Sequence, residues 1–327
     1  MTIIHKIFFK LRYYHDLLYP EIEYLDCIKE SQKSSDIIYE KLTSSEPCMI
    51  ARYGSVELYA LSNYLGIKKG WNSCVDFIRG KSEPWWWIPK RLFELKNNAG
   101  FFSADNIELV EKYCDLLLKD TDYLDVLASW VDKEVYLKKQ LNRVDKIFLP
   151  YLEPYWAEKP WTRALEGKKV LVVHPFTELI SHQYHNNRKN LFRNSQVLPV
   201  FELKTLKSVQ SIGGDGNGFT TWFEALDWMK AEIDKIDYDI CIIGCGAYGF
   251  HLAAHVKRMG KKAIHMGGAT QLLFGIKGKR WEDSMYGVKE WNLPYGFYTE
   301  MFNEYWIKPG QKERPLKADS VEGACYW

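Results

Sequence analysis

Three closely spaced glycines are the first feature of this 327-residue sequence that points to ligand chemistry. Gly244, Gly246 and Gly249 follow a short apolar run and open a segment with helical periodicity. A glycine turn at a helix N-terminus presents free backbone N–H groups and the positive end of the helix dipole, and both favour phosphate. Alternatively, the glycines only let the helix pack closely on the preceding strand. The pattern therefore predicts either a phosphate-binding turn or a packing device.

The strand after this helix bears on which phosphate ligand is expected. Enzymes that bind NAD carry an acidic residue about 20 residues beyond the glycine turn, and enzymes that bind NADP have a basic residue nearby. Here the strand ends in His265 and Met266, so neither residue type is present. We therefore expect no NAD cofactor, and an NAD(P)-dependent oxidoreductase is kept only as an alternative function.

A loop rich in glycine and basic side chains follows that strand and covers residues 265–283. Such a loop can wrap a diphosphate, because Lys and Arg neutralise its charge and Arg donates paired hydrogen bonds. The alternative is an ordinary surface loop with solvated lysines. The residues that we expect to bind ligand in this loop are His265, Gly267, Gly268, Gln271, Lys277 and Arg280.

A second group of candidate residues lies in "MIARYGSVELYAL", residues 49–61. A buried strand ends at Arg52, a turn follows at Gly54, and Glu57 falls in the first turn of a helix. Arginine at a strand end can fork two hydrogen bonds onto a phosphate. Glu57 is a candidate metal ligand or general base, or a favourable partner for the helix dipole.

The third group lies in "VVHPFTELISHQYHNNR", residues 172–188. His174 ends a buried strand at the sheet edge where α/β proteins bind ligands, and Glu178 follows on the next helix. His174 can instead be a turn histidine that bonds only to the backbone. The candidate general bases are therefore Glu57, His174 and Glu178, and the sequence does not rank them.

The elements that must position these residues alternate between strands and helices. Strands are expected within 47–54 and 167–176 and at 239–243 and 262–265, with helices near 34–44, 106–120, 177–192, 203–210 and 219–235. Alternation of this kind predicts an α/β fold: a Rossmann-like, mostly parallel sheet flanked by helices. The aromatic and proline-rich stretch 150–161 divides the chain into parts 1–150 and 151–327, which we expect to form one integrated domain.

Composition narrows the class of protein further. The 44 Lys and Arg residues nearly balance the 42 Asp and Glu residues, which argues against a nucleic-acid partner. Seven cysteines without a CxxC pair are typical of reduced thiols in the cytoplasm. No apolar run approaches the roughly 20 residues of a membrane span. We therefore expect a cytoplasmic protein.

Two aromatic or apolar segments suggest surface contacts. In the N-terminal helix, Ile3, Ile4, Ile7, Phe8 and Leu11 share one face, with Lys6, Lys10 and Arg12 nearby. This helix either lies on the inner face of an anionic membrane or packs on the domain. The segment "EPWWWIPK", residues 83–90, is either a platform for an acceptor sugar or a buried aromatic cluster.

Several of these segments resemble known bacterial proteins. "ARYGSVEL" is similar to the "ARFGDGE" element of bacterial glycosyltransferases with the GT-D fold, and "IIGCGAYGFHLAAHVKRMGKKAIHMGG" resembles their later strand, glycine turn, helix and strand. With "VLVVHPF", "GGATQLLFGIKGKRW" and "VEGACYW", the chain also resembles proteins of surface-polysaccharide synthesis, including capsule synthesis. The resemblance implies an enzyme that transfers a sugar from a nucleotide-sugar donor to a surface-glycan acceptor, which can be lipid-linked.

One departure from the GT-D element affects the expected cofactor. Both acids of the family's Asp-x-Glu element serve a divalent metal and the diphosphate, whereas this chain has Ser55 in place of the aspartate and keeps only Glu57. Binding of Mn²⁺ or Mg²⁺ through Glu57 is therefore in doubt, unless Asp76 or another acid completes the site. The same change permits a non-catalytic nucleotide- or glycan-binding protein.

Overall fold

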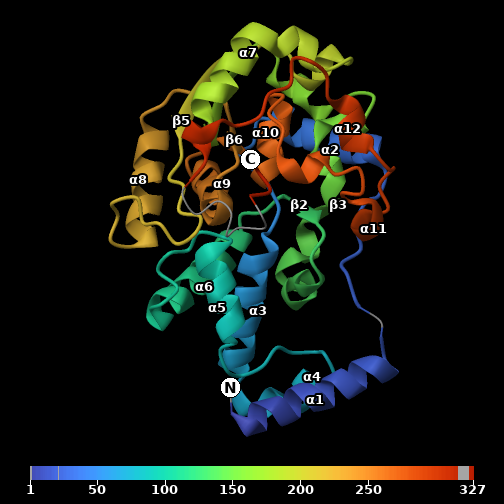
Figure 1. Ribbon diagram of the computed structural model, residues 1–327, viewed down its shortest axis with the longest axis vertical. Coiled ribbons are helices and arrows are strands. Elements are labelled where there is room, and N and C mark those ends of the chain that lie inside the picture. Colours follow the sequence, from blue (N-terminus) through green and yellow to red (C-terminus); the bar gives the residue numbers. More distant parts are fainter. Residues whose placement is uncertain (1, 21, 316–323) are drawn as a thin grey trace.

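The computed structural model describes residues 2–20, 22–315 and 324–327, and it has the expected α/β architecture (Figure 1). Seven strands form one sheet in the order β3-β2-β1-β7-β6-β4-β5, and every neighbouring pair is parallel. This confirms the Rossmann-like fold class. The strands are β1 (Cys48–Ala51), β2 (Val126–Ser129), β3 (Asp145–Phe148), β4 (Lys169–His174), β5 (Glu202–Lys207), β6 (Ile240–Ile243) and β7 (Lys262–His265).

Helices cover both faces of the sheet because the central strands are apolar on both faces. In β4, Leu171 and Val173 pack on one side, while Val170 and Val172 pack on the other. Helices α3 (Ser55–Lys69), α6 (Ile107–Thr121), α8 (Trp222–Asp234) and α9 (Gly249–Arg258) contribute to the first core. The second core includes α2 (Ser31–Thr43), α7 (Thr177–Leu191) and α10 (Thr270–Leu273).

The two halves of the chain contribute to the same sheet. Strands β1 to β3 come from residues 1–150 and β4 to β7 from residues 151–327, and β1 pairs with β7 between them. At β4 and β6 the chain leaves the sheet on opposite faces, into α7 and α9 respectively. In parallel sheets such a reversal opens a crevice at the carboxyl ends of the strands, where ligands bind.

One predicted helix is wrong, and strands β2, β3 and β5 were not predicted. Residues 203–210 do not form a helix, because β5 occupies Glu202–Lys207 and pairs with β4. This is an edge strand with lysines at 204 and 207, so it lacks the apolar signature of a buried strand. Strands β2 and β3 have four residues each, as do β1, β6 and β7, but they are not followed by the glycine turn that marked those three strands in the sequence.

The N-terminal region forms a separate small layer at one end of the molecule. Figure 1 shows α1 (Ile3–Leu18) and α4 (Cys74–Ile78) together at that end, with α3 leading from the sheet toward them. Trp85 and Trp86 belong to this layer: Trp85 contacts Phe8 edge-on at 4.9 Å between ring centroids, and Trp86 stacks on His5 at 3.9 Å. Trp87 packs against the first core instead. The aromatic segment is therefore a packed cluster under α1 and not a platform for a sugar. The other helices are α5 (Pro89–Asn97), α11 (Val288–Trp291) and α12 (Phe297–Met301).

Candidate functional site

A cavity of about 150 Å³ lies at the carboxyl ends of the central strands, and most of the expected site residues line it. These residues come from segments that follow β1, β4, β6 and β7. They meet because the strands are parallel and end at one edge of the sheet. The expected residues that line the cavity are Arg52, Gly54, Ser55, Glu57, His174, Gly244, Gly246, His265, Gly267, Gly268, Gln271 and Arg280.

Arg52 is the central cation of this cavity. It follows β1 directly, and its guanidinium lies 4.9 Å from the centroid of the Trp130 ring. The Trp130 indole in turn donates a hydrogen bond to the Tyr53 carbonyl at 2.9 Å. The stacked ring holds the guanidinium by a cation–π contact and leaves its edge available for an anion.

Glu134 holds the backbone at Trp130 in place through hydrogen bonds. Its buried carboxylate accepts hydrogen bonds from the backbone N–H groups of Trp130 and Val131 at 3.2 and 3.3 Å, and a further one from the Ser129 hydroxyl. Burial raises the pKa of Glu134 to about 7, although these hydrogen bonds and the Arg52 charge lower it. Sequence analysis missed Glu134 and Trp130, because the strand that precedes them was not predicted.

The Glu57 side chain packs directly against Gly54 at the start of α3. A methyl group on Gly54 would lie 1.9 Å from a carboxylate oxygen of Glu57, so a side chain at position 54 would displace that carboxylate. The glutamate therefore folds back over the helix N-terminus, where the dipole favours its negative charge. Because it also lines the cavity, its carboxylate is positioned for both a structural and a chemical role.

The three glycines of the turn have different roles. A methyl group on Gly244 would lie 2.6 Å from the Gly267 carbonyl, and one on Gly249 would lie 2.1 Å from the His265 ring. These two positions allow close packing, which is the alternative considered for the motif, and Gly249 does not line the cavity described above. Gly246 has a φ of 56° and faces the cavity, so it remains the glycine that can serve a ligand.

This difference predicts separate effects of alanine at the two positions. Gly249→Ala should lower the free energy of unfolding by about 2 kcal/mol, because the buried His265 ring must move, and it should affect ligand binding only through that ring. Gly246→Ala should lower the free energy of unfolding by about 1 kcal/mol, because alanine adopts the left-handed conformation at this position less readily than glycine does. It should also weaken phosphate binding. Urea unfolding and calorimetric titration of a nucleoside diphosphate would measure both. Unchanged stability of Gly249→Ala would contradict the packing role.

His174 lines the cavity, but its environment argues against the role of general base. Burial lowers its pKa to about 3, and its Nδ1 accepts a hydrogen bond from the Phe176 N–H at 3.0 Å. This bond assigns the proton to Nε2. The neutral ring can therefore donate a hydrogen bond from Nε2, but it is too weak a base to remove a proton from a hydroxyl.

His265 is also buried and neutral. Burial, together with the Arg52 charge, lowers its pKa to about 3, and its Nδ1 lies 3.2 Å from the Ile243 carbonyl. Gln271 is held in a similar way, because its amide nitrogen donates to the Ile276 and Tyr326 carbonyls at 3.3 and 3.2 Å. Both side chains therefore shape the cavity wall and hold neighbouring segments in place.

Three other expected residues lie elsewhere. Glu178 is exposed and pairs with Lys312 at 2.6 Å. The ammonium of Lys277 lies 5.4 Å from the centroid of the Phe302 ring. Asp76 belongs to α4, at the far end of the 15-residue helix α3, which is about 22 Å long. Glu178 is therefore not placed as a base, Lys277 does not neutralise a ligand in this cavity, and Asp76 cannot complete a metal site with Glu57.

A second, wider cavity of about 670 Å³ adjoins the first. The two share Arg52, Ser55, Trp130, Gly268, Arg280 and Tyr326. Beyond this common wall, the second cavity is lined by the aromatic side chains Trp281, Tyr286 and Trp291. Flat apolar faces of this kind suit the apolar faces of sugars or bases.

Arg280 joins the C-terminal segment to this common wall. Its guanidinium lies 4.6 Å from the centroid of the Tyr326 ring and donates a hydrogen bond to the Cys325 sulfur at 2.7 Å. Tyr326 and Trp327 line the first cavity, as do the residues 208–212 that follow β5. Sequence analysis did not include them. Residues 208–212 could have been expected at the site because they follow strand β5, but that segment was predicted as a helix.

The described residues contain no group of three or more His, Cys, Asp or Glu side chains that could hold a metal ion. Among these described residues, Glu57 therefore does not belong to a cluster of carboxylates of the kind that a hard divalent cation prefers. The positive groups Arg52 and Arg280 line the cavity instead. Chemically, the arrangement can bind an anionic ligand through the guanidinium groups of Arg52 and Arg280.

Comparisons of this chain with protein-family models, with curated proteins and with solved structures find no match.

Proposed function

We propose that this protein is a glycosyltransferase that moves a sugar from a nucleotide-sugar donor to a glycan acceptor in the cytoplasm. The observation that carries the proposal is the common wall of the two cavities, where Arg52 and Arg280 lie beside the glycine turn. A diphosphate at this wall would have charge compensation on one side and room for a sugar on the other. The resemblance to GT-D enzymes supports the same assignment.

The first cavity suits the diphosphate of the donor. It is narrow, it reaches the glycine turn at Gly246, and two guanidinium groups line it. When the sugar leaves, negative charge develops on the diphosphate, and positioned cations stabilise that charge. Arg52 and Arg280 can supply this stabilisation without a dicarboxylate metal site, which fits the presence of Ser55 in place of an acid.

The second cavity suits the acceptor. Its volume of about 670 Å³ and its aromatic side chains provide stacking surfaces for sugar rings. Transfer requires a base that takes a proton from the acceptor hydroxyl. Of the three bases considered, His174 is neutral and weakly basic, and Glu178 is exposed and ion-paired. Glu57 lines the first cavity close to Ser55 of the common wall, so it remains the candidate base for an acceptor hydroxyl that reaches that wall.

A thermal-shift panel tests the donor class. A nucleoside diphosphate present at 100 times its dissociation constant should stabilise the protein by about 2.7 kcal/mol, whereas NAD(H) should not stabilise it. The panel should include UDP, GDP and CMP, each with and without Mn²⁺. The variant Arg52→Gln should lose the response, while Lys277→Gln, a matched change of a cation that lies over Phe302, should keep it.

Two outcomes would change the proposal. Stabilisation by NAD(H) with no response to any nucleoside diphosphate would favour the oxidoreductase alternative. Stabilisation by a nucleoside diphosphate without sugar transfer to any glycan acceptor would favour the non-catalytic binding protein that the loss of the motif aspartate permits.

A further inference from the structure

Helix α1 presents an apolar row to solvent. Ile3, Ile7, Leu11, Tyr14 and Leu18 follow one another at intervals of three or four residues and so share one face of the helix. They are 78%, 52%, 44%, 52% and 75% exposed, respectively. An exposed apolar row of this length is rare on a protein that stays in water, and it marks a surface that contacts another phase or partner.

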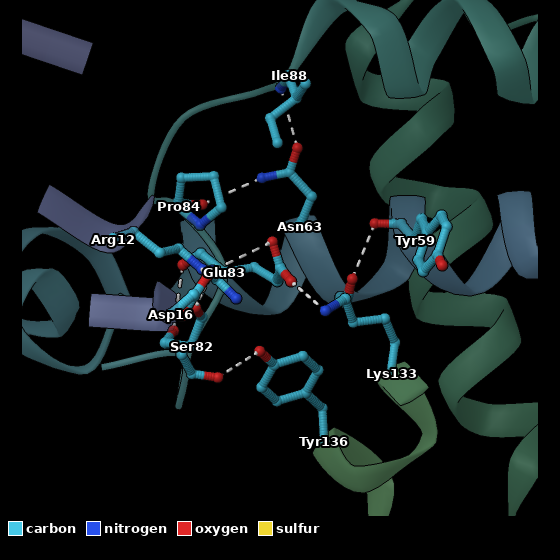
Figure 2. A network of polar contacts seen from close by, with 12 residues as sticks. Arg12, Asp16, Tyr59, Asn63, Ser82, Glu83, Pro84, Ile88, Lys133 and Tyr136 are labelled. Carbon is cyan, nitrogen blue, oxygen red and sulfur yellow. Dashed lines mark hydrogen bonds and ion pairs between the residues drawn. The ribbon is translucent and has the colours of Figure 1, made fainter. Parts of the chain in front are cut away.

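The opposite face fixes α1 to the rest of the protein. The His5 ring stacks on Trp86 with 3.9 Å between centroids, and Phe9 contacts Phe77 edge-on at 5.5 Å. Arg12 donates a hydrogen bond to the Ser82 carbonyl at 3.2 Å and lies 4.0 Å from the buried Glu83 carboxylate (Figure 2). The exposed row is therefore held in a definite orientation, and contacts within the described chain do not cover it.

Lysines border this apolar row, and the segments around it carry more cations than acids. Lys6 and Lys10 are exposed along its edge. The neighbouring segment 68–81 adds the exposed apolar side chains of Trp71 and Val75, which are 58% and 51% exposed. Within 2–20 and 68–81 the charged residues are seven Lys and Arg against two Asp: Lys6, Lys10, Arg12, Lys68, Lys69, Arg79 and Lys81 against Asp16 and Asp76.

We propose that α1 lies flat on an anionic lipid surface, with the row Ile3, Ile7, Leu11, Tyr14 and Leu18 inserted at the level of the headgroups. An apolar face bordered by lysines matches such a surface in both hydrophobicity and charge. Of the helices described, none combines the length and apolar composition that crossing a bilayer requires, so the contact is peripheral. The inference does not depend on the reaction proposed for the site.

A second copy of the chain fits this face less well than a membrane does. A two-fold dimer brings the same patch of each subunit together, so the basic rim would meet another basic rim. Like charges placed opposite each other disfavour association, whereas anionic headgroups neutralise them. The charge around the row therefore favours lipid as the partner.

This orientation places the cavities away from the bilayer. Helix α3 runs from the cavity to the α1 layer and is about 22 Å long (Figure 1). The cavities would then lie on the order of 20 Å above the lipid surface. A membrane-anchored acceptor would have to extend over that distance.

Vesicle co-sedimentation of the full chain tests the proposal. The protein should bind vesicles of phosphatidylcholine with about one-third phosphatidylglycerol far better than phosphatidylcholine alone, and added salt should weaken the binding. Ile7→Glu with Leu11→Glu should reduce the partition coefficient roughly tenfold or more. Lys6→Gln and Lys10→Gln should each reduce the partition coefficient about fivefold on anionic vesicles only.

Val200→Glu is the matched control. This change replaces an apolar side chain that is 59% exposed and lies outside the α1 layer, and the variant should bind vesicles as the wild type does.

Two results would overturn the proposal. One is the absence of binding to anionic vesicles at low salt. The other is a concentration-dependent dimer in analytical ultracentrifugation that Ile7→Glu with Leu11→Glu dissociates, because a second copy would then cover the row. Near-ultraviolet circular dichroism, which reports the packing of aromatic side chains, should be unchanged in the variants, since the changes leave the contacts of His5, Phe9 and Arg12 intact.

Discussion

Replacing Glu57 with glutamine should lower the rate of sugar transfer by roughly 100-fold. The carboxylate lines the first cavity, where we propose that the diphosphate binds, and is the remaining candidate base. If Glu57 served only as a dipole partner for α3, glutamine would cost about 0.3–1 kcal/mol of stability and leave transfer unchanged. The measurement is the transfer rate at saturating donor, after thermal unfolding has confirmed the fold.

Two further variants sharpen this test. Glu178→Gln makes the same chemical change at an exposed glutamate, so it should retain full activity. Gly54→Ala keeps Glu57 but places a methyl group 1.9 Å from a carboxylate oxygen, which should displace the carboxylate and lower activity as well. Full activity of Glu57→Gln would reduce this residue to a helix partner and leave the GT-D resemblance a matter of fold alone.

The second large effect is expected at Glu83, where glutamine should lower the free energy of unfolding by about 3 kcal/mol. The carboxylate is 2% exposed and lies 2.8 Å from Arg91. It also lies 3.2 Å from Lys133 and 4.0 Å from Arg12 (Figure 2). Glutamine would leave three cations close together without their shared anion. Because Arg12 belongs to α1, the variant should also loosen α1 from the tryptophan cluster.

The pH dependence of the Glu83 effect follows from its pKa. Burial would raise this pKa, but Arg91, Lys133 and Arg12 together lower it below the usual 4.5. The carboxylate therefore contributes its full stability above that value, and the contribution is lost as pH falls through the lowered pKa. The difference between wild type and Glu83→Gln should be constant near neutral pH and shrink in acid.

A surface glutamate provides the control for Glu83. Glu202 is exposed and lies 3.3 Å from Lys204, so Glu202→Gln should change the free energy of unfolding by less than about 0.5 kcal/mol. Urea unfolding at several pH values would compare the two variants. A Glu83→Gln protein as stable as the Glu202→Gln protein would show that the buried carboxylate is not what holds this network together.

The amino-acid sequence by itself determined the fold class, and it indicated which residues would meet at the edge of the sheet where the candidate site lies. Continuous apolar runs such as 169–174 predict strands buried on both faces, and strands of that kind occur in parallel sheets. Parallel strands end at one edge, so Arg52, His174 and the glycine turn were expected to meet there. Most of the expected residues do line one cavity for this reason.

The tertiary structure alone decided what each of these residues can do. His174 and Glu178 appear equally suitable in sequence, but one is buried with Nδ1 already hydrogen-bonded and the other is exposed and ion-paired. Gly246 and Gly249 belong to one motif, yet only the first faces the cavity, because the His265 ring packs against the second. Trp130 and Tyr326 join the site from segments almost 200 residues apart. Burial, protonation and orientation depend on contacts between distant segments, which local sequence patterns do not contain.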